Sequence, residues 1–370
     1  MRKIKILFFI GNLCYGGKER RLIELIAGLK NKSNVDILLV LAFNQIDYEY
    51  FFDIGIKFIS IDKKPKSKSI KVFFQLNKIV REYKPNLIHT WGSMQTFYMI
   101  PIALMNQINL INSQITDAPP HIKKLSYKNF LNKINFRFSD INLSNSYAGL
   151  KAYGVSTSNK SRVIHNGFDF KRISNLTKPI DVRNHFQIKT KYVIGMVASF
   201  SEKKDYTTYI DSAISILSIR NDVTFLCVGA GNDKPFIRKI PETFRNKIKF
   251  LSRQEKVESI MRICDIGVLT SNPITHGEGI SNAIMEFMAL SKPVIASDNG
   301  GTSEIIKTNV TGFIIPNRSK QKLEEKVLVL LNNSDKRKEM GNAGIERIKN
   351  KFNIGNMVNS FLELYNHLST

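Results

Sequence analysis

The chain has 370 residues, a hydrophobic content of 43% and a formal net charge of +24 at pH 7. This length is large for a single hydrophobic core and fits two domains. The composition is that of an ordinary globular protein, and no apolar run approaches the ~20 residues of a membrane-spanning helix. Three scattered cysteines are too few for a disulfide framework or a zinc site, which favours a cytosolic protein.

A strand is predicted at residues 4 to 10, followed by a glycine-containing loop that ends at Gly16 and Gly17. The start of the chain is similar to a short signal peptide, but no small-residue cleavage site follows. The apolar spacing of residues 22 to 29 predicts a helix after the loop. A strand, a glycine turn and a helix form the first unit of a doubly wound sheet, which binds ligands at the carboxyl ends of its strands. Gly16 and Gly17 would allow close approach to a diphosphate, and the alternative is a plain tight turn.

Strands and helices continue to alternate through the first half of the chain. The apolar runs predict strands at 35–43, 57–61, 85–89 and 140–144, an amphipathic helix at 69–83, and a helix followed by a strand in 96–111. His89 is expected at a strand end that faces the ligand side, although a lone histidine is more often structural. The run at 96–111 is expected to be broken by Pro101, Asn106, Gln107 and Asn109. It could also form a shallow apolar surface for a lipid acceptor.

Basic residues are spread along the whole chain and also form two clusters. One cluster occupies residues 63–68, and the other occupies 123–137, where lysines and an arginine alternate with Tyr127, Phe130, Phe136 and Phe138. This pattern is typical of a protein that meets nucleic acid or an anionic membrane, and the alternative is a compositional bias without function. No recognition helix or base-stacking module is evident, so we expect no nucleic acid partner.

A polar segment at 170–190 is interpreted as a linker, after which the alternation starts again. Strands are predicted at 192–198, 224–228, 265–269, 294–296 and 311–316, and the final helix carries Met357, Phe361, Leu364, Tyr365 and Leu368 on one face. The glycines at 229 and 231 are a weak nucleotide signal, because Lys234 stands in place of a third glycine.

The stretch from residue 264 to 304 contains the strongest chemical signal. Its loop holds Glu278, and the helix that follows holds Glu286 and ends before Pro293. The backbone N–H groups near residues 280 to 283 have no partner within that helix, so they form a ready anion site. Two carboxylates beside an anion site suit a phosphorylated polyol such as a nucleotide sugar. The alternative is that both glutamates lie on a solvated helix face.

This stretch resembles the family 4 glycosyltransferases of the GT-B fold, whose signature is two glutamates separated by seven residues. Glu278 and Glu286 have this spacing, and further residues match the family: Ser271, Gly277, Gly279, Lys292-Pro293-Val294-Ile295, Gly300-Gly301 and Glu304. The resemblance spans nearly the full chain and is densest from 192 to 316.

The resemblance implies an α/β fold of the GT-B class, with two Rossmann-like doubly wound domains that face a cleft. Residues 1–172 would form an acceptor-binding domain and residues 190–350 a nucleotide-sugar-binding domain. Residues 351–370 would form a helix that crosses back to the first domain.

The resemblance also implies a retaining glycosyltransferase that uses a nucleotide-sugar donor, with a UDP-sugar preferred. Glu278 would contact the transferred sugar and Glu286 the ribose. The diphosphate would be held by groups from both domains: Gly16, Gly17, Lys204 and the backbone of Gly279, Ile280 and Ser281.

The acceptor would be a glycan or a lipid-linked sugar in cell-surface polysaccharide synthesis, and the transferred group a hexose or an N-acetylhexosamine. The chain contains no Asp-x-Asp pair, which indicates a metal-independent enzyme without a resident cofactor. We expect a cytoplasmic protein, with its basic first half at an anionic inner membrane face.

The sequence departs from the family pattern at two places. Ser199 stands where the family has an arginine, five residues before Lys204, so a hydroxyl would replace one positive contact with the diphosphate; Lys203 would be the functional amine if the loop shifted by one residue. A family histidine is missing near residue 115, where Asp117 and His121 are the polar candidates. A catalytically impaired partner subunit, a nucleotide-sugar epimerase and a sugar phosphorylase of the same fold therefore remain alternatives.

Overall fold

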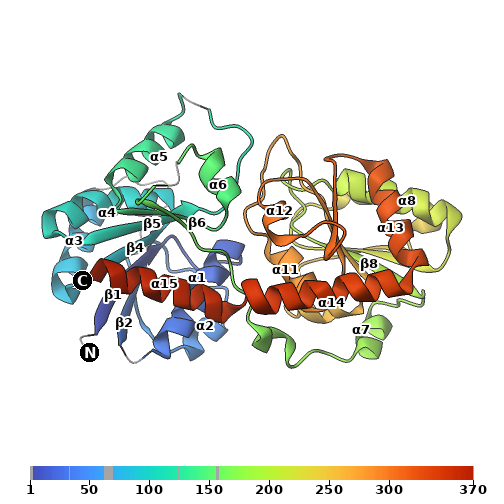
Figure 1. Cartoon of the computed structure of the whole chain (residues 1–370), viewed down its shortest axis with the longest axis horizontal. Helices are drawn as coiled ribbons and strands as arrows, with labels where there is room; N and C mark the ends of the chain where they lie inside the picture. Colours follow the sequence, from blue (N-terminus) through green and yellow to red (C-terminus); the bar gives the residue numbers. More distant parts are fainter. Residues whose placement is uncertain (1–2, 33, 62–69, 124, 156–157, 370) are drawn as a thin grey trace. The chain divides into compact units, whose positions relative to one another are not determined.

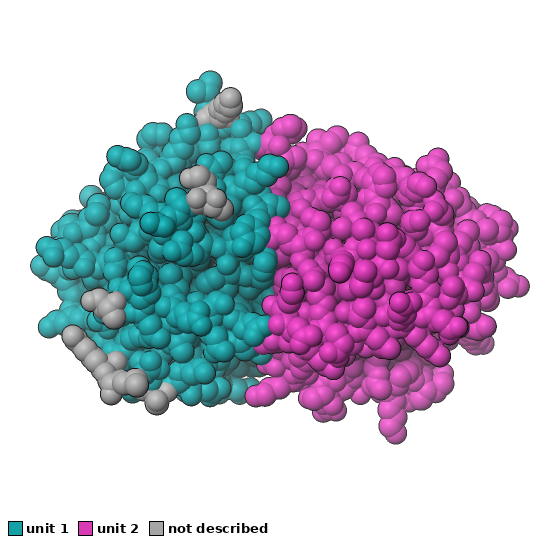
Figure 2. Space-filling view, viewed as in Figure 1, with its two compact units in different colours: residues 1–116, 122–167, 354–370 teal, residues 117–121, 168–353 magenta. Residues whose placement is uncertain are grey.

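A computed structural model describes residues 3–32, 34–61, 70–123, 125–155 and 158–369, which form two compact units (Figures 1 and 2). Unit 1 comprises Met1–Thr116, Ile122–Gly167 and Ile354–Thr370, and unit 2 comprises Asp117–His121 and Phe168–Asn353. The units divide at Gly167, five residues before the expected boundary at 172. The basic cluster predicted at 63–68 lies entirely outside the described residues.

Unit 1 contains a parallel sheet of seven strands in the order β3-β2-β1-β4-β5-β6-β7. The strands are β1 (Ile4–Ile10), β2 (Val35–Leu41), β3 (Lys57–Ser60), β4 (Leu87–Trp91), β5 (Asn109–Ile115), β6 (Ile141–Ser144) and β7 (Ser161–Val163). The first six agree with the strands expected from the apolar runs, and β7 was not predicted. Their side chains are mostly buried because helices cover both faces of the sheet.

The helices of unit 1 divide between two hydrophobic cores. They are α1 (Gly17–Lys30), α2 (Tyr50–Asp53), α3 (Ile70–Tyr83), α4 (Ser93–Asn106), α5 (Tyr127–Phe138), α6 (Tyr147–Ala152) and α15 (Ile354–Ser369). One core joins the sheet to α1 and α15, and the other joins it to α3 and α4. The C-terminal helix α15 lies beside α1, which explains why a segment from the end of the chain belongs to unit 1 (Figure 1).

Two expectations for unit 1 were wrong. His89 does not lie at a strand end that faces a ligand, but in the middle of β4, where it is fully buried. The apolar run does break between Asn106 and Asn109, as expected, but Pro101 does not contribute to the break, because α4 continues through it to Asn106. A proline removes one helical hydrogen bond, and the burial of neighbouring side chains such as Met99 and Ile102 offsets that loss.

Unit 2 contains a parallel sheet of six strands in the order β10-β9-β8-β11-β12-β13. The strands are β8 (Tyr192–Val197), β9 (Val223–Val228), β10 (Ile248–Leu251), β11 (Ile266–Leu269), β12 (Val294–Ser297) and β13 (Gly312–Ile315). The strand order reverses at β8, which lies between β9 and β11. In an open parallel sheet, this reversal leaves a crevice at the carboxyl ends of the two strands.

Short and long helices surround the sheet of unit 2. They are η1 (Phe170–Ile173), α7 (Pro179–His185), α8 (Tyr206–Ile219), α9 (Lys234–Ile237), η2 (Glu242–Phe244), α10 (Val257–Ile263), α11 (Asn282–Ala289), α12 (Thr302–Ile305), α13 (Lys320–Asn332) and α14 (Ser334–Lys351). The segment at 170–190 is therefore no simple linker. Pro179 begins α7, where its fixed φ suits a helix start, and α7 packs against α10.

The predicted fold class of two doubly wound, Rossmann-like domains and a returning C-terminal helix is confirmed. Among the helices in the described ranges, none is long and apolar enough to cross a membrane.

Candidate functional site

The candidate site in unit 2 forms where the strand order reverses. The loop after β8 carries Lys204, and the loop after β11 begins at Thr270 and carries Glu278. The two loops pair through an antiparallel bridge between Lys204 and Ser271, and the N–H of Asn272 donates to the carbonyl of Lys203 at 3.0 Å. The backbone thus fixes one loop against the other before any side chain contributes.

The side chain of Glu278 lies between three polar groups. Its Oε1 accepts hydrogen bonds from Lys204 Nζ and Ser271 Oγ, and its Oε2 lies 3.6 Å from His276 Nε2. Glu278 is only 8% exposed and Lys204 only 14%, so water screens the pair weakly. Burial alone would raise the pKa of Glu278, but the charge of Lys204 and the contact with His276 hold that pKa well below its usual range. The result is a buried carboxylate that stays ionised at neutral pH beside an ammonium group.

The backbone around Glu278 is held by the loop after β12. The N–H of Glu278 donates to Asn299 Oδ1 at 2.9 Å, and Asn299 Nδ2 donates to the carbonyl of His276 at 3.0 Å. The N–H of Gly301 donates to the carbonyl of Glu278 at 2.8 Å. Gly300 adopts a φ of +55°, and a Cβ at this position would lie 2.1 Å from the Glu278 carbonyl oxygen. Only glycine fits there, which explains Gly300 in the sequence.

The short segment at residues 117–121 packs against the Glu278 loop. The N–H of Ala118 donates to the carbonyl of Gly277 at 2.9 Å, and a Cβ on Gly277 would lie 1.7 Å from the Ala118 carbonyl oxygen. This contact explains why residues 117–121 belong to unit 2. Asp117 is half-buried next to the contact, whereas His121 is exposed.

The helix α11 begins four residues after Glu278. Gly279, Ile280 and Ser281 form the buried turn into the helix, and Ser281 is its N-cap, without a capping bond from its side chain. The positive end of the helix dipole and its first backbone N–H groups favour an anion at this end. The structure thus places the predicted diphosphate-binding backbone directly next to the buried ion pair.

Glu286 lies in the second turn of α11 and points into the protein. Its side chain is 4% exposed, and Arg172 of η1 donates to its Oε1 at 2.6 Å. Arg172 also pairs with Glu258 of α10, so one guanidinium group joins two carboxylates. Both Glu278 and Glu286 are therefore buried, and the alternative of a solvated helix face is wrong.

The other predicted site residues are placed less centrally. Ser199 is exposed, and its Oγ lies 3.0 Å from Ser201 Oγ. Lys203 is also exposed, so Lys204 is the lysine of this loop that reaches Glu278. Gly16 is the N-cap of α1 in unit 1, where its N–H donates to Tyr48 Oη at 3.1 Å, and Gly17 is the first residue of that helix. These two glycines belong to unit 1, and the remaining predicted site residues belong to unit 2.

Three residues that shape the site were not predicted from the sequence: Arg172, His276 and Asn299. Arg172 fell in the presumed linker. His276 directly precedes Gly277, and Asn299 directly precedes Gly300; both glycines are part of the family motif. This neighbourhood was the only indication in the sequence that the two residues belong to the site. Matching residue types to the motif does not predict that side-chain or backbone atoms of Asn299 and His276 contact Glu278.

The chain is similar to known glycosyltransferases. Residues 178–347 match the family model described as "Glycosyl transferases group 1". The poly(ribitol-phosphate) alpha-N-acetylglucosaminyltransferase of Staphylococcus aureus is 24% identical over 361 residues, which cover 91% of this chain and 69% of the relative. The GalNAc-alpha-(1->4)-GalNAc-alpha-(1->3)-diNAcBac-PP-undecaprenol alpha-1,4-N-acetyl-D-galactosaminyltransferase of Campylobacter jejuni is 22% identical over 375 residues, which cover 98% of each chain.

The fold also has solved counterparts. The crystal structure of Anabaena HepE in complex with UDP and glucose superposes with a TM-score of 0.84 and 20% identity, and the match covers 98% of this chain and 100% of HepE. The chain therefore has the GT-B fold, and its residues 178–347 match the model of the glycosyl transferases group 1 family.

Proposed function

We propose that this chain is a retaining, family 4 glycosyltransferase that moves a hexose or an N-acetylhexosamine from a UDP-sugar to a glycan or lipid-linked acceptor. Its role would be the synthesis of a cell-surface polysaccharide. The observation that carries the proposal is the buried, ionised Glu278 beside Lys204 at the start of α11. A carboxylate that accepts sugar hydroxyls and a cation that meets a diphosphate are thereby held within one small site.

The similar proteins support the choice of donor and acceptor. The Staphylococcus aureus relative is named for the transfer of N-acetylglucosamine to poly(ribitol-phosphate), and the Campylobacter jejuni relative for a substrate linked to PP-undecaprenol. HepE was crystallised in complex with UDP and glucose. These are properties of those proteins, and they make UDP-sugars and polymeric or lipid-linked acceptors the first compounds to test on this chain.

In the proposed mechanism, the site stabilises charge that develops as the sugar leaves its diphosphate. Glu278 accepts a hydrogen bond from a hydroxyl of the transferred sugar and faces the positive charge that forms on the ring. Lys204 and the backbone N–H groups at Gly279 to Ser281 stabilise the departing diphosphate, as preorganised dipoles and charges do in other sites of this kind.

The remaining predicted residues complete the donor site. Glu286 accepts from the ribose hydroxyls, while Gly16, Gly17 and Ser199 provide further contacts to the diphosphate. The leaving phosphate itself takes the acceptor's proton, so the mechanism requires no separate base. Lys204 supplies the positive charge, and for this reason we propose that the reaction is independent of metal ions.

We also propose that the chain works in the cytoplasm, at the inner face of a membrane. Cys14, Cys227 and Cys264 are free thiols, which suits a reducing compartment. The strongly basic first half suits contact with anionic lipids.

A thermal-shift screen with UDP-, GDP- and ADP-sugars, carried out in EDTA, tests the donor site. A ligand that binds only the native state raises the melting temperature by mass action. We expect a UDP-sugar to stabilise the wild type and the control Glu346→Gln, whose carboxylate is exposed on α14, and to stabilise Glu286→Gln much less. NMR of the glycoside product then tests whether the anomeric configuration is retained.

Other outcomes would support the alternatives. If no nucleotide sugar binds, the chain is a partner subunit without donor activity. Isomerisation of the donor in the absence of acceptor identifies an epimerase, and consumption of free phosphate identifies a phosphorylase. Loss of activity in EDTA that is restored by a divalent cation would overturn the proposed metal independence.

A further inference from the structure

Three neighbouring helices of unit 1 expose an unusual number of large apolar side chains. Helix α4 packs against both α3 and α5, and together they form what we call the α3–α5 face. More than half of the surface of each of the following side chains is exposed: Ile70, Phe74, Leu104, Met105, Tyr127 and Phe130. A concentration of exposed apolar side chains on adjacent elements marks an interaction surface.

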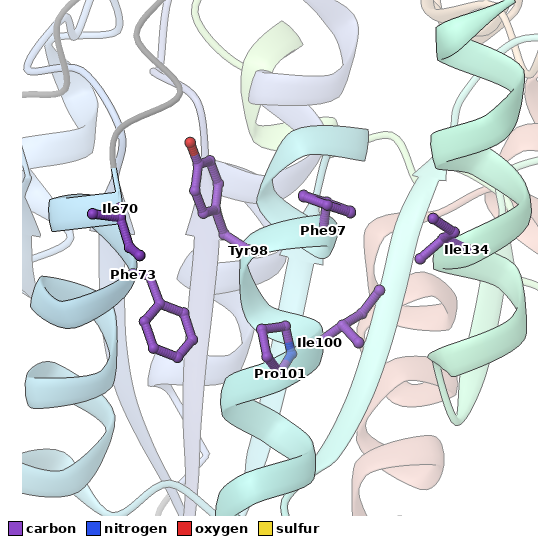
Figure 3. A pocket seen from close by; sticks show the side chains of 7 residues that line it. All are labelled: Ile70, Phe73, Phe97, Tyr98, Ile100, Pro101 and Ile134. Atoms are coloured by element: carbon purple, nitrogen blue, oxygen red, sulfur yellow. The ribbon is translucent and has the colours of Figure 1, made fainter.

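An apolar pocket of about 330 Å³ lies within this face. Ile70 and Phe73 of α3, Phe97 and Pro101 of α4, and Ile134 of α5 contribute to its wall (Figure 3). Of its seven lining side chains, only that of Tyr98 carries a polar atom, and Figure 3 shows its hydroxyl directed away from the other rings. The pocket therefore suits a hydrocarbon group and offers little to a polar ligand.

The charge around this face is mostly positive, although α3 also carries the exposed Glu82. Between Glu82 and Asp140 the sequence contains a single acidic residue, Asp117, which belongs to unit 2, and it contains six basic residues: Lys84, Lys123, Lys124, Lys128, Lys133 and Arg137. On α5, Lys133 and Arg137 are exposed at helical spacing from the apolar row Phe130, Ile134 and Phe138. Apolar and basic side chains thus occupy the same side of this helix.

We propose that the α3–α5 face is a binding surface for an anionic phospholipid bilayer, with one acyl chain entering the apolar pocket. Exposed aromatic and aliphatic side chains would enter the boundary between head groups and acyl chains, while Lys133 and Arg137 meet the lipid phosphates. Exposed aliphatic residues such as Leu104 and Met105 have no role in binding a nucleic acid backbone. This inference rests on the membrane location proposed above, for which it names the surface, and it does not depend on the proposed donor site.

Flotation of the full chain with vesicles tests the charged part of the face. We expect binding to phosphatidylcholine vesicles that contain about 30 mol% phosphatidylglycerol, and little binding to pure phosphatidylcholine. The variant Lys133→Glu/Arg137→Glu should lower the partition coefficient at least ~30-fold, because each basic residue near an anionic surface contributes roughly fivefold. The control Lys239→Glu/Lys338→Glu makes the same change in net charge at exposed positions of unit 2 and should bind nearly as well as the wild type.

A second pair of variants tests the apolar part. Phe130→Ser removes an exposed ring from α5 and should weaken vesicle binding about tenfold, because the buried ring area is lost. Ile219→Ser changes an equally exposed apolar side chain on α8 of unit 2 and should leave binding unchanged.

Several results would overturn the proposal. They are an absence of vesicle binding, equal losses in the two charge variants, or a dimer in solution that Phe130→Ser dissociates, which would make the face an interface between copies. Salt-sensitive RNA binding that requires Lys133 and Arg137, without vesicle binding, would also overturn it. The donor thermal shift, measured on the same variants, should be unchanged. A failed vesicle assay with intact donor binding therefore refutes this inference and the proposed membrane location, but not the proposed glycosyl transfer.

Discussion

At the scale of single residues, Lys204 and Glu278 form a buried ion pair in the candidate site. Removing one partner of a buried ion pair leaves an uncompensated charge, which costs about 3–5 kcal/mol of stability, whereas removing both costs much less. We therefore expect Lys204→Met to lower the free energy of unfolding by about 3 kcal/mol, and Lys204→Met/Glu278→Gln to recover most of that loss. Urea unfolding of the four members of this double-mutant cycle measures both values.

The neighbouring lysine provides a matched control. Lys203 is exposed, so Lys203→Met should change stability by no more than about 0.5 kcal/mol. If Lys204→Met were equally harmless, the ion pair would contribute nothing to the folded state. Both Lys204→Met and Glu278→Gln should also lower the transfer rate about 10²–10³-fold, because each removes a charge placed for the transition state.

Gly300 supports a second prediction at this scale. Alanine at this position would adopt an unfavourable positive φ and would also collide with the Glu278 carbonyl oxygen. Gly154 has a similar φ of +64°, but a Cβ there would meet nothing within 4 Å. Gly300→Ala should therefore destabilise the chain by about 2 kcal/mol more than Gly154→Ala, as measured by thermal unfolding. Equal losses would mean that the loop moves aside without cost.

The sequence could identify Glu278 and Lys204 as separate members of a motif, but not as partners. They lie 74 residues apart, and their contact depends on how the loops after β8 and β11 meet. The same holds for Glu286: the sequence predicted its position in a helix, but not its burial or its ion pair with Arg172. Residue identity and spacing predict which groups matter, and tertiary packing decides which atoms touch.

At the scale of elements, Arg172 joins η1 to two helices, α10 and α11. Its guanidinium group holds Glu258 and Glu286 together, so Arg172→Met would leave two buried carboxylates facing each other. We expect a loss of about 3–5 kcal/mol in urea unfolding. The control is Lys322→Met. Lys322 pairs with Glu325, which is exposed on α13, so this substitution should lower the free energy of unfolding by less than about 1 kcal/mol.

The Arg172 variant also reports on the donor site. If Arg172 holds Glu286 in place for the ribose, the Km for the donor should rise more than kcat falls. If Arg172→Met lowers the free energy of unfolding but leaves the Km for the donor unchanged, the ion pairs of Arg172 contribute to stability alone.

Elements with strong periodicity were predictable, and elements with polar sequences were not. The buried strands and the last helix followed from their apolar runs, because a parallel sheet is covered on both faces. The segment at 170–190 has no such run, so η1 and α7 were mistaken for a linker. This segment is held in place by contacts with residues of α10, which lie more than 80 residues away in sequence.

At the scale of the whole molecule, alternation of strands and helices was sufficient to predict two doubly wound domains. The sequence did not predict that residues 117–121 belong to unit 2, because this depends on one close backbone contact between Ala118 and Gly277. The return of α15 to unit 1 was predicted from the resemblance, and its apolar face supplied the physical reason.

The two units carry different buried titratable groups, which gives them different responses to acid. In unit 1, His89 is fully buried, with Nδ1 at 2.7 Å from Tyr365 Oη and Nε2 at 2.6 Å from Ser113 Oγ. Burial and the nearby charge of Arg21 lower the pKa of His89 well below its ordinary value. In unit 2, the pKa of Glu278 is also lowered, but from the much lower starting value of a carboxyl group.

These shifts predict the order in which the units lose stability as the pH falls. Below about pH 6.5 the unfolded chain protonates His89 while the folded chain does not, so unit 1 should lose up to ~1.4 kcal/mol per pH unit. The contribution of Glu278 to unit 2 is present above the pKa of an unfolded carboxyl group and should decline only below about pH 4.5.

Trp91, the only tryptophan in the sequence, is buried beside His89 in unit 1, so its fluorescence during urea unfolding reports on that unit. Between about pH 7.5 and 5 the Trp91 transition should move to lower urea in the wild type and in His165→Gln, and much less in His89→Gln. An equal shift in all three chains would show that the acid sensitivity of unit 1 comes from a group other than His89.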